Sequence, residues 1–148
     1  MRISFVAASS PDFRMLAAKL DEYYFELVGD IQNRYAEVNR PENMTALAVA
    51  YEAGEPIACG AWKRIDATTA ELKRLYVLPQ FRRKGVARSL IASLEADAAA
   101  AGIRHMILET AVDTTDSHRL YLSAGYRITD YYGSPAGAEN CLCFHKEL

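Results

Sequence analysis

Apolar residues recur at helical spacing in the first part of the chain. Ser10-Pro11 has the residue types of a helix N-cap followed by a proline at the first helical position. An apolar stripe with a period of three to four residues begins at Phe13 and ends before Gly29. The pattern predicts an amphipathic helix over residues 11–28. A second, shorter helix is expected over residues 33–39, before a proline.

A block of sequence typical of β-strands follows. The runs 46–51 and 57–64 flank an Ala-Gly turn, which indicates a hairpin. A third run, 70–77, follows a short polar turn and ends at Leu78-Pro79. The spacing predicts three successive antiparallel strands.

The second half of the chain alternates helical and extended patterns. A helix is predicted over residues 86–101, and a strand of the buried, parallel kind over residues 103–110. A short helix near residues 116–124 and two strands near 126–129 and 140–146 complete the pattern. The element order predicts a mixed α+β fold in which strand 70–77, helix 86–101 and strand 103–110 form a crossover unit.

Composition narrows the class of protein. The 148 residues, 51% of them hydrophobic and 24% charged, suffice for one globular domain. The net charge of −2 argues against a general nucleic-acid or anionic-membrane surface. We expect neither a membrane span nor a signal peptide, because no apolar stretch has the required length. Three cysteines, an odd number, argue against a secreted disulfide framework, so a soluble cytoplasmic protein is expected.

One segment concentrates positive charge. The stretch from Leu72 to Leu94 has no acidic residue and six basic ones: Lys73, Arg74, Arg82, Arg83, Lys84 and Arg88. Such a local excess on a chain of net charge −2 indicates a small anionic ligand rather than a long polyanion. Residues 82–87 lie between a predicted strand and a predicted helix, where free amide N–H groups favour phosphate. Gly85 would let the backbone approach an anion closely. A solvated basic loop is the alternative.

Three segments together resemble a known family. Neither common glycine-rich phosphate motif fits residues 82–87. Arg82, Gly85 and Ala87 instead resemble the acyl-CoA loop of the GNAT superfamily of N-acetyltransferases, (Gln/Arg)-x-x-Gly-x-(Gly/Ala). The preceding Leu-Tyr-Val-Leu-Pro (75–79) is similar to the family's fourth strand, and Leu-Tyr-Leu-Ser-Ala-Gly-Tyr (120–126) is similar to its LYxxxGF/Y element. The resemblance covers about residues 45–130 and points to small single-domain bacterial members.

The resemblance implies a fold and a reaction. The fold would be the GNAT-like acyl-CoA N-acyltransferase fold, a mixed central sheet of about six to seven strands flanked by about four helices. The reaction would transfer an acetyl group from acetyl-CoA to a primary amine of a small molecule or peptide, by direct attack in a ternary complex. No metal is expected, and a homodimer would be the family's assembly. The alternatives are a non-catalytic acyl-CoA sensor on the same fold and a phosphate-binding scaffold without CoA.

The resemblance also assigns residues to CoA. The amides of residues 83–88 would hold the pyrophosphate, and the basic side chains would attract it. The pantetheine arm would pair with the end of the fourth strand as an added strand, and the N–H of Leu75 would polarise the acetyl carbonyl. The residues implied in CoA binding are Leu75, Tyr76, Val77, Arg82, Arg83, Lys84, Gly85, Val86, Ala87 and Arg88.

Two residues match catalytic positions of the family. Tyr121 matches the usual general acid toward the departing thiolate, and a tyrosine that packs the short helix is its alternative. Glu71 matches a position for a base or a water-ordering group. An amine with a pKa of about 10 is ammonium at pH 7 and must lose a proton before it attacks. An edge carboxylate paired with Lys73 or Arg64 is the alternative for Glu71, and Glu109 is a second candidate base.

The remaining histidines and cysteines fit structural roles. His105, His118 and His145 lack zinc-ligand spacing and are expected to be structural or exposed. Cys141 and Cys143 alternate along a predicted strand, so both thiols face one side. Core packing is expected for this pair, with a metal or redox pair as the alternative.

Four tyrosines are candidates for the acceptor pocket, because the first helices and the last loop flank the cleft in this family: Tyr23, Tyr24, Tyr131 and Tyr132. Tyr24 also lies on the apolar stripe of the first predicted helix, so packing is its alternative.

Overall fold

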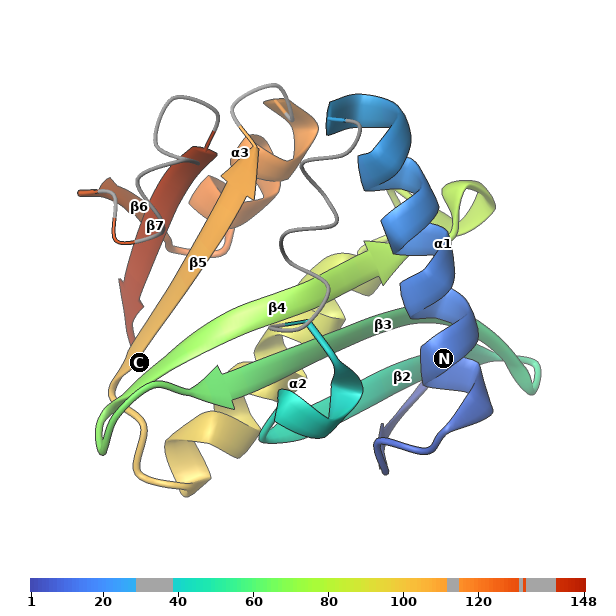
Figure 1. The fold of residues 1–148 in the computed structure, drawn as a ribbon, viewed down its shortest axis with the longest axis horizontal. Helices are drawn as coiled ribbons and strands as arrows, with labels where there is room; N and C mark the ends of the chain where they lie inside the picture. The colour runs from blue at the N-terminus through green and yellow to red at the C-terminus, as the bar shows by residue number, and fades with distance from the viewer. Residues whose placement is uncertain (29–38, 112–114, 131, 133–140) are drawn as a thin grey trace.

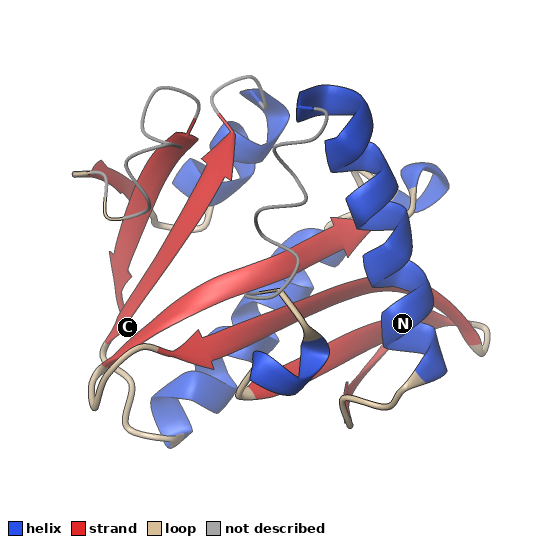
Figure 2. Ribbon diagram, viewed as in Figure 1, coloured by secondary structure: helices blue, strands red, loops and turns tan. Residues whose placement is uncertain are grey.

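A seven-stranded sheet with the strand order β1-β2-β3-β4-β5-β7-β6 forms the centre of the fold (Figures 1 and 2). The structure is a computed structural model that describes residues 1–28, 39–111, 115–130, 132 and 141–148. The strands are β1 (Arg2–Val6), β2 (Ala46–Glu52), β3 (Glu55–Arg64), β4 (Thr69–Val77), β5 (His105–Ala111), β6 (Arg127–Thr129) and β7 (Cys141–Glu147). The helices of the described residues are α1 (Pro11–Val28), α2 (Val86–Ala100) and α3 (Thr115–Ser123), with 3-10 turns η2 (Pro41–Asn43) and η3 (Pro79–Phe81).

The α+β class and the order of the central elements are confirmed. Strands β2, β3 and β4 pair antiparallel in succession. Strand β4 pairs in parallel with β5, and helix α2 is the crossover connection between them. One strand was missed, because β1 lies at the edge of the sheet and alternates only weakly between exposed and half-buried positions. The helix expected over residues 33–39 falls almost entirely outside the described residues, which contain three α-helices rather than about four. None of these helices combines the length and apolar character needed to cross a membrane.

Helix α1 covers one face of the sheet. The Ser10 hydroxyl accepts a hydrogen bond from the Phe13 amide at 3.3 Å, which confirms the predicted N-cap. Phe13 and Leu16 are fully buried against β2 and β3, where they contact a cluster that includes Cys59 and Ala61. The apolar stripe of the sequence is therefore the surface by which α1 packs on the sheet.

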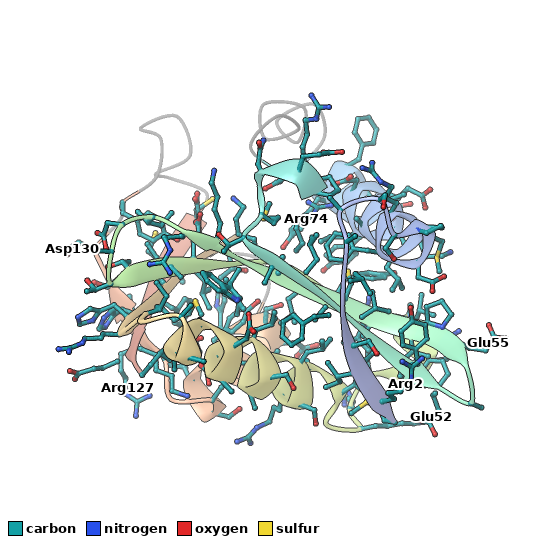
Figure 3. All side chains as sticks on the ribbon, turned by 90° about the horizontal axis from the view of Figure 1, so that it is seen from below. Arg2, Glu52, Glu55, Arg74, Arg127 and Asp130 are labelled. Atoms are coloured by element: carbon teal, nitrogen blue, oxygen red, sulfur yellow. The ribbon has the colours of Figure 1, made fainter. Side chains whose placement is uncertain are left out.

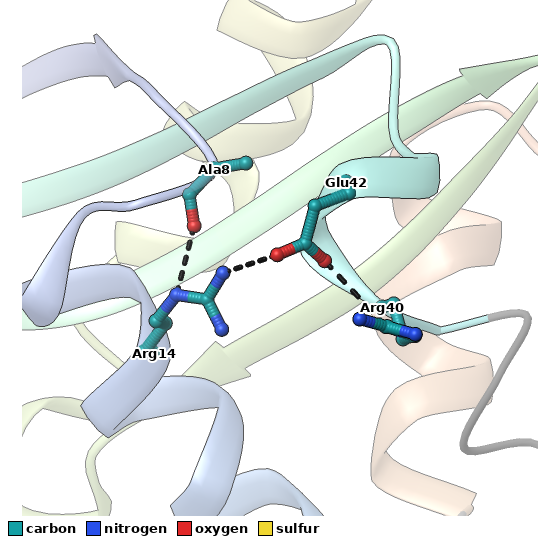
Figure 4. Close-up of polar contacts among 4 residues, drawn as sticks. All are labelled: Ala8, Arg14, Arg40 and Glu42. Atoms are coloured by element: carbon teal, nitrogen blue, oxygen red, sulfur yellow. Dashed lines mark hydrogen bonds and ion pairs between the residues drawn. The ribbon is translucent and has the colours of Figure 1, made fainter.

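A surface network links the first turn of α1 to η2 (Figure 4). The Arg14 guanidinium donates to the carbonyl oxygen of Ala8 at 2.9 Å and to the carboxylate of Glu42 in η2. Arg40 Nε lies 3.7 Å from the other Glu42 oxygen. The backbone amide of Glu42, and then Arg14, lower the pKa of this carboxyl group. Exposed ion pairs contribute little to stability, so the network mainly sets the position of α1 relative to η2.

Helix α2 covers the opposite face of the sheet, as Figure 3 shows. Leu90, Ile91 and Leu94 are fully buried in the larger core cluster, which also contains Trp62. A Cβ atom on Gly60 would lie 2.8 Å from Cδ1 of Leu94, so a larger residue there would force the Leu94 side chain of α2 to shift.

The strands β4 and β5 form a fork. Their parallel pairing consists of three residue pairs, Thr69↔His105, Ala70↔Met106 and Glu71↔Ile107. Beyond Glu71 the two strands diverge, although β4 continues to Val77 (Figure 1). The edge of β4 that faces β5 therefore has free backbone groups over its last residues.

A β-bulge lies in β4 next to the fork. The register between β3 and β4 runs from Ala61↔Lys73 to Cys59↔Tyr76, so two steps on β3 oppose three steps on β4. Arg74, within the extra step, has a left-handed backbone with φ 58°. Such bulges bend a strand and redirect the residues around them.

Candidate active site

A cavity of about 660 Å³ lies between the end of β4, the start of α2, one side of α3 and the later turns of α1. Nine of the ten residues predicted to bind CoA line it: Leu75, Tyr76, Val77, Arg82, Arg83, Gly85, Val86, Ala87 and Arg88. Lys84 is not among the lining residues, and its Nζ lies 5.6 Å from the centre of the Phe81 ring. The structure thus brings the segments that carry the predicted CoA site to one cavity.

The loop before α2 presents free amide groups to this cavity. The first hydrogen bond of helix α2 is donated by the Ser89 amide to the carbonyl oxygen of Gly85, the N-cap residue, at 3.1 Å. Among the described residues, the amides of 83–88 have no backbone acceptor. Arg83 and Gly85 both have left-handed backbones, with φ 63° and 82°. Amides in such a turn at a helix N-terminus form a concave anion site.

Gly85 is favoured by its left-handed backbone conformation rather than by crowding. A Cβ atom built on it would meet nothing within 4 Å in the free protein. The open space above this residue leaves room for an anion to contact the backbone, and that contact stays a prediction.

Arg82 holds the loop against β4. Its Nε donates to the Val77 carbonyl at 2.9 Å. The guanidinium carbon lies 5.5 Å from the centre of the Tyr76 ring and 6.0 Å from that of Tyr23. Arg82 therefore connects the loop, β4 and α1 through the aromatic rings, in addition to contributing positive charge to the cavity.

Tyr121 lines the cavity from α3 and also packs into the core. Its ring centre lies 6.1 Å from that of Tyr126 and 5.8 Å from that of Phe144. Burial, with a smaller contribution from Tyr24, raises the pKa of Tyr121. Burial also raises the pKa of Tyr24, which lines the same cavity from α1, although Arg74 opposes this shift. The phenols of Tyr121 and Tyr24 are therefore neutral at neutral pH, and they line the cavity together with Tyr23 and Tyr76.

Glu71 lies at the point where the fork opens, outside the residues that line the cavity. Lys73 Nζ is 3.5 Å from its Oε1, so the ion pair that the sequence allowed is present. Tyr132 donates a hydrogen bond of 2.8 Å to its Oε2. Burial, and then the Glu71 carboxylate, raise the pKa of Tyr132, which keeps this phenol a neutral donor.

The second candidate base, Glu109, lies on β5 opposite Cys143 of β7. It accepts a hydrogen bond from Cys141, and burial together with this carboxylate raises the pKa of Cys141 to about 12. Glu109 also makes a small contribution to the raised pKa of Tyr132, after burial and Glu71. Tyr131, a further candidate for the acceptor pocket, lies outside the described residues.

The other histidines and cysteines take structural positions. His105 Nδ1 and His145 Nε2 lie 2.9 Å apart on β5 and β7, and His118 packs against Phe144. All three cysteines are free thiols, with Cys59 and Cys143 buried and Cys141 half-buried. In the part of the chain that the structure describes, no group of three or more metal-ligating side chains could hold a metal ion.

Sequence reasoning missed a group of polar residues in α3. Asp116, Ser117 and Arg119 line the cavity together with Tyr121. The signal for Ser117 was available, because a residue four positions before Tyr121 shares its face of the helix. Arg119 adds a basic side chain to the cavity wall.

Comparisons with known proteins identify the family. The model of the Acetyltransferase (GNAT) family matches residues 8–126. The chain belongs to this family. The IAA acetyltransferase of Azospirillum brasilense is 31% identical over 137 residues, which cover 87% of this chain and 85% of that protein. The aminoglycoside N(6')-acetyltransferase type 1 of Salmonella typhimurium is 34% identical over 59 residues, 40% of this chain and 41% of that protein.

A solved structure shares the fold. The GNAT family acetyltransferase from Elizabethkingia anophelis, with acetyl-CoA bound, matches with a TM-score of 0.72 at 21% identity, over 99% of this chain and 97% of that one. The GNAT resemblance seen in Arg82, Gly85 and Ala87 is therefore confirmed, as is the GNAT fold. The family match also begins at residue 8, well before the segment that the sequence motifs covered.

Proposed function

We propose that this GNAT protein is an acetyl-CoA-dependent N-acetyltransferase that acetylates a primary amine of a small molecule or peptide. The observation that carries the proposal is the composition of the cavity wall. Free amides at the start of α2, the free edge of β4 and the Tyr121 phenol lie along one cavity. This arrangement suits an elongated ligand with an anionic end, an extended arm and a reactive carbonyl group.

Each segment of the wall has a role in binding. The amides of 83–88 donate to the pyrophosphate of CoA, and the exposed side chains of Arg83, Arg88 and Arg119 provide positive potential. The edge of β4 from Leu75 to Val77 pairs with the pantetheine arm as an added strand, since β5 leaves this edge free. Bound in this way, acetyl-CoA supplies an acyl group activated as a thioester.

The transfer needs three contributions from the chain, from the Leu75 N–H, from Glu71 and from Tyr121. The Leu75 N–H donates to the carbonyl oxygen, where negative charge develops as the amine nitrogen attacks the carbonyl carbon. Glu71 accepts the proton that the amine loses, through an intervening water. The carbon–sulfur bond then breaks, and the electron pair stays on sulfur.

Tyr121 donates a hydrogen bond to that sulfur. Its pKa is raised further above the value of about 8.5 typical of a thiol, so full proton transfer to a free thiolate is uphill. A hydrogen bond that strengthens while charge develops on sulfur still lowers the barrier. Burial in the cavity also raises the pKa of the departing thiol, which reduces the difference between the pKa of Tyr121 and that of the thiol.

Direct attack by the amine is supported by the state of the cysteines. Burial raises the pKa of both Cys59 and Cys141 to about 12. Each is therefore a thiol rather than a thiolate at neutral pH, and thiols are poor nucleophiles. An acetylated cysteine intermediate on either residue is disfavoured.

Turnover tests the proposal. The purified protein is mixed with acetyl-CoA and a panel of polyamines, aminoglycosides, amino acids and peptides, and released thiol and acetylated product are both measured. Amine-dependent release of CoA with a matching acetylated amine supports the enzyme. Tight binding of acetyl-CoA without turnover of any amine would favour the sensor instead. The homodimer and the cytoplasmic location stay predictions.

A further inference from the structure

The peptide bond between Arg74 and Leu75 is held from two directions. The Cys59 thiol on β3 donates to the Arg74 carbonyl oxygen at 3.3 Å. The Arg74 guanidinium reaches the other way, where Nη2 donates to the Ala17 carbonyl at 3.0 Å and to Asp21 Oδ1 at 2.7 Å on α1. Figure 3 shows Arg74 on the side of the sheet that α1 covers. Strand β4 is thus tied to β3 and to α1 at a single residue.

Arg74 carries two unfavourable features at this position. Its left-handed φ of 58° is costly for any residue other than glycine. Its side chain is buried, and Nε has no hydrogen-bond partner among the described residues. A glycine would avoid both costs. The contacts of the arginine side chain must therefore offset them, and backbone strain of this kind concentrates at functional sites.

The contact with Cys59 sets the direction of the next amide. No peptide bond of the described chain is cis, and in a trans peptide the C=O and N–H groups point in opposite directions. Because the Arg74 carbonyl points to Cys59 on β3, the Leu75 N–H points away from Cys59. The edge of β4 away from β3 is the one that β5 leaves free beyond Glu71, and Leu75 lines the cavity there.

We propose that Cys59 and Arg74 are positioning residues that aim the Leu75 N–H at the carbonyl oxygen of the acyl thioester. The inference rests on the proposed function. Cys59 orients the peptide through its carbonyl end, and Arg74 holds the bulge in its strained conformation by its anchor on α1. Neither side chain needs to touch the substrate to do so.

Two matched pairs of variants test this assignment. Cys59→Ala removes the donor, whereas Cys59→Ser keeps one. Arg74→Met removes the guanidinium, whereas Arg74→Lys keeps a cation that can reach Asp21. We expect Cys59→Ala and Arg74→Met to lower kcat about tenfold or more, with the Kd for CoA within about threefold of the parent. The conservative variants should recover much of that loss. Asp21→Ala loosens the same anchor from the exposed side and is used if Arg74→Met fails to fold.

An infrared measurement separates positioning from stability. The carbonyl stretch of bound acetyl-CoA labelled with 13C at the carbonyl should lie at lower frequency than in water, and should move back toward the free value in Cys59→Ala and Arg74→Met. If Cys59→Ala and Arg74→Met fold and keep both the carbonyl frequency and the kcat of the parent, the inference is overturned. The proposed acetyltransferase function is not affected by that result. A parent protein that fails to bind acetyl-CoA overturns the proposed function and this inference with it.

Discussion

The hydroxyl of Tyr132 donates a hydrogen bond of 2.8 Å to Glu71, although the two residues lie 61 positions apart in the chain. The other oxygen of the same carboxylate faces Lys73 at 3.5 Å. Each oxygen of Glu71 thus has one neighbour that fixes its direction. The carboxylate lies where β4 and β5 separate, at the base of the fork between them.

This relationship predicts a pH-dependent defect in Glu71→Gln. The amide cannot accept a proton, so the rate should fall most at low pH, where free amine is scarcest, and recover toward the amine pKa of about 10. Tyr132→Phe should give a smaller loss with the same pH dependence, because it only frees the carboxylate to rotate. The pH–rate profile at saturating acetyl-CoA measures both effects. A parental profile in Glu71→Gln would move the base to Glu109, which Glu109→Gln then tests.

Tyr121 and Tyr24, two of the four tyrosines that line the cavity, form a matched pair of positions for a test of the sulfur donor. Tyr121→Phe should lower kcat by roughly 10²-fold, the scale of a positioned donor, with the CoA affinity little changed. Tyr24→Phe removes a hydroxyl from the same cavity wall and serves as the comparison. The loss in Tyr121→Phe should shrink with a thioester whose thiol is more acidic, because that leaving group needs less stabilisation. If Tyr24→Phe shows the larger, leaving-group-dependent loss, the donor is Tyr24.

Gly85→Glu should abolish binding of acetyl-CoA while the fold survives. The substitution places a carboxylate where the amides of 83–88 would hold a pyrophosphate. Gly54→Glu is the matched control, because Gly54 has the same φ of 82° and an equally open surrounding in the β2–β3 turn. Isothermal titration should detect no binding for Gly85→Glu and parental binding for Gly54→Glu. If both variants bind acetyl-CoA with the affinity of the parent, the loop of residues 83–88 is not part of the CoA site.

Stability should fall at alkaline pH partly because of Cys59. Burial raises the pKa of the Cys59 thiol to about 12, whereas an unfolded cysteine ionises near 8.5. Between these values the unfolded chain loses a proton that the folded chain retains, so the free energy of unfolding decreases as pH rises. Urea unfolding from pH 8 to 11 should show a shallower decrease in Cys59→Ala than in the parent. An identical slope would mean that the thiol ionises in the folded protein as it does in the unfolded one.

Tyr126 is expected to matter for stability alone. Its hydroxyl donates to Glu95 at 2.8 Å, and Lys146 donates to the other Glu95 oxygen at 2.9 Å, which connects α2 and β7 to the residue just before β6. Tyr126→Phe should lower the free energy of unfolding by about 1–3 kcal/mol without changing acetyl-CoA affinity. Tyr51→Phe loses a similar bond to Asp12 at a more exposed site and should cost less. If the two variants lose the same free energy of unfolding, burial of the hydrogen bond does not determine the size of the loss.

The sequence predicted the elements with strong periodicity and missed those defined by contacts. Helix α1 begins where predicted because Ser10 is a recognisable N-cap, and α2 begins where its apolar periodicity starts at Val86. Strand β1 was missed because pairing with β2, rather than a buried face, defines it. The insertion of β7 between β5 and β6 is likewise a long-range pairing that no local pattern carries.

The segments proposed to bind CoA were predictable from the sequence, and the surroundings of Glu71 were less so. The loop of 82–88 and Tyr121 are contiguous motifs, so their types and spacing indicate their chemistry. The bulge at Arg74 has no such signal, since its left-handed backbone falls on an arginine rather than on glycine or asparagine. The hydrogen bond from Tyr132 to Glu71 depends on the fork between β4 and β5, which only the assembled sheet creates.

The hydrogen-bond donors at the start of α2 are main-chain amides. This affects how the sequence of such a protein can diverge. Every amino acid except proline carries an amide N–H, so drift among the side chains of 83–88 leaves those donors in place. Gly85 is the exception, because its φ of 82° restricts what can replace it. A lineage could therefore exchange most of its sequence, its acceptor included, while it keeps the same acyl donor.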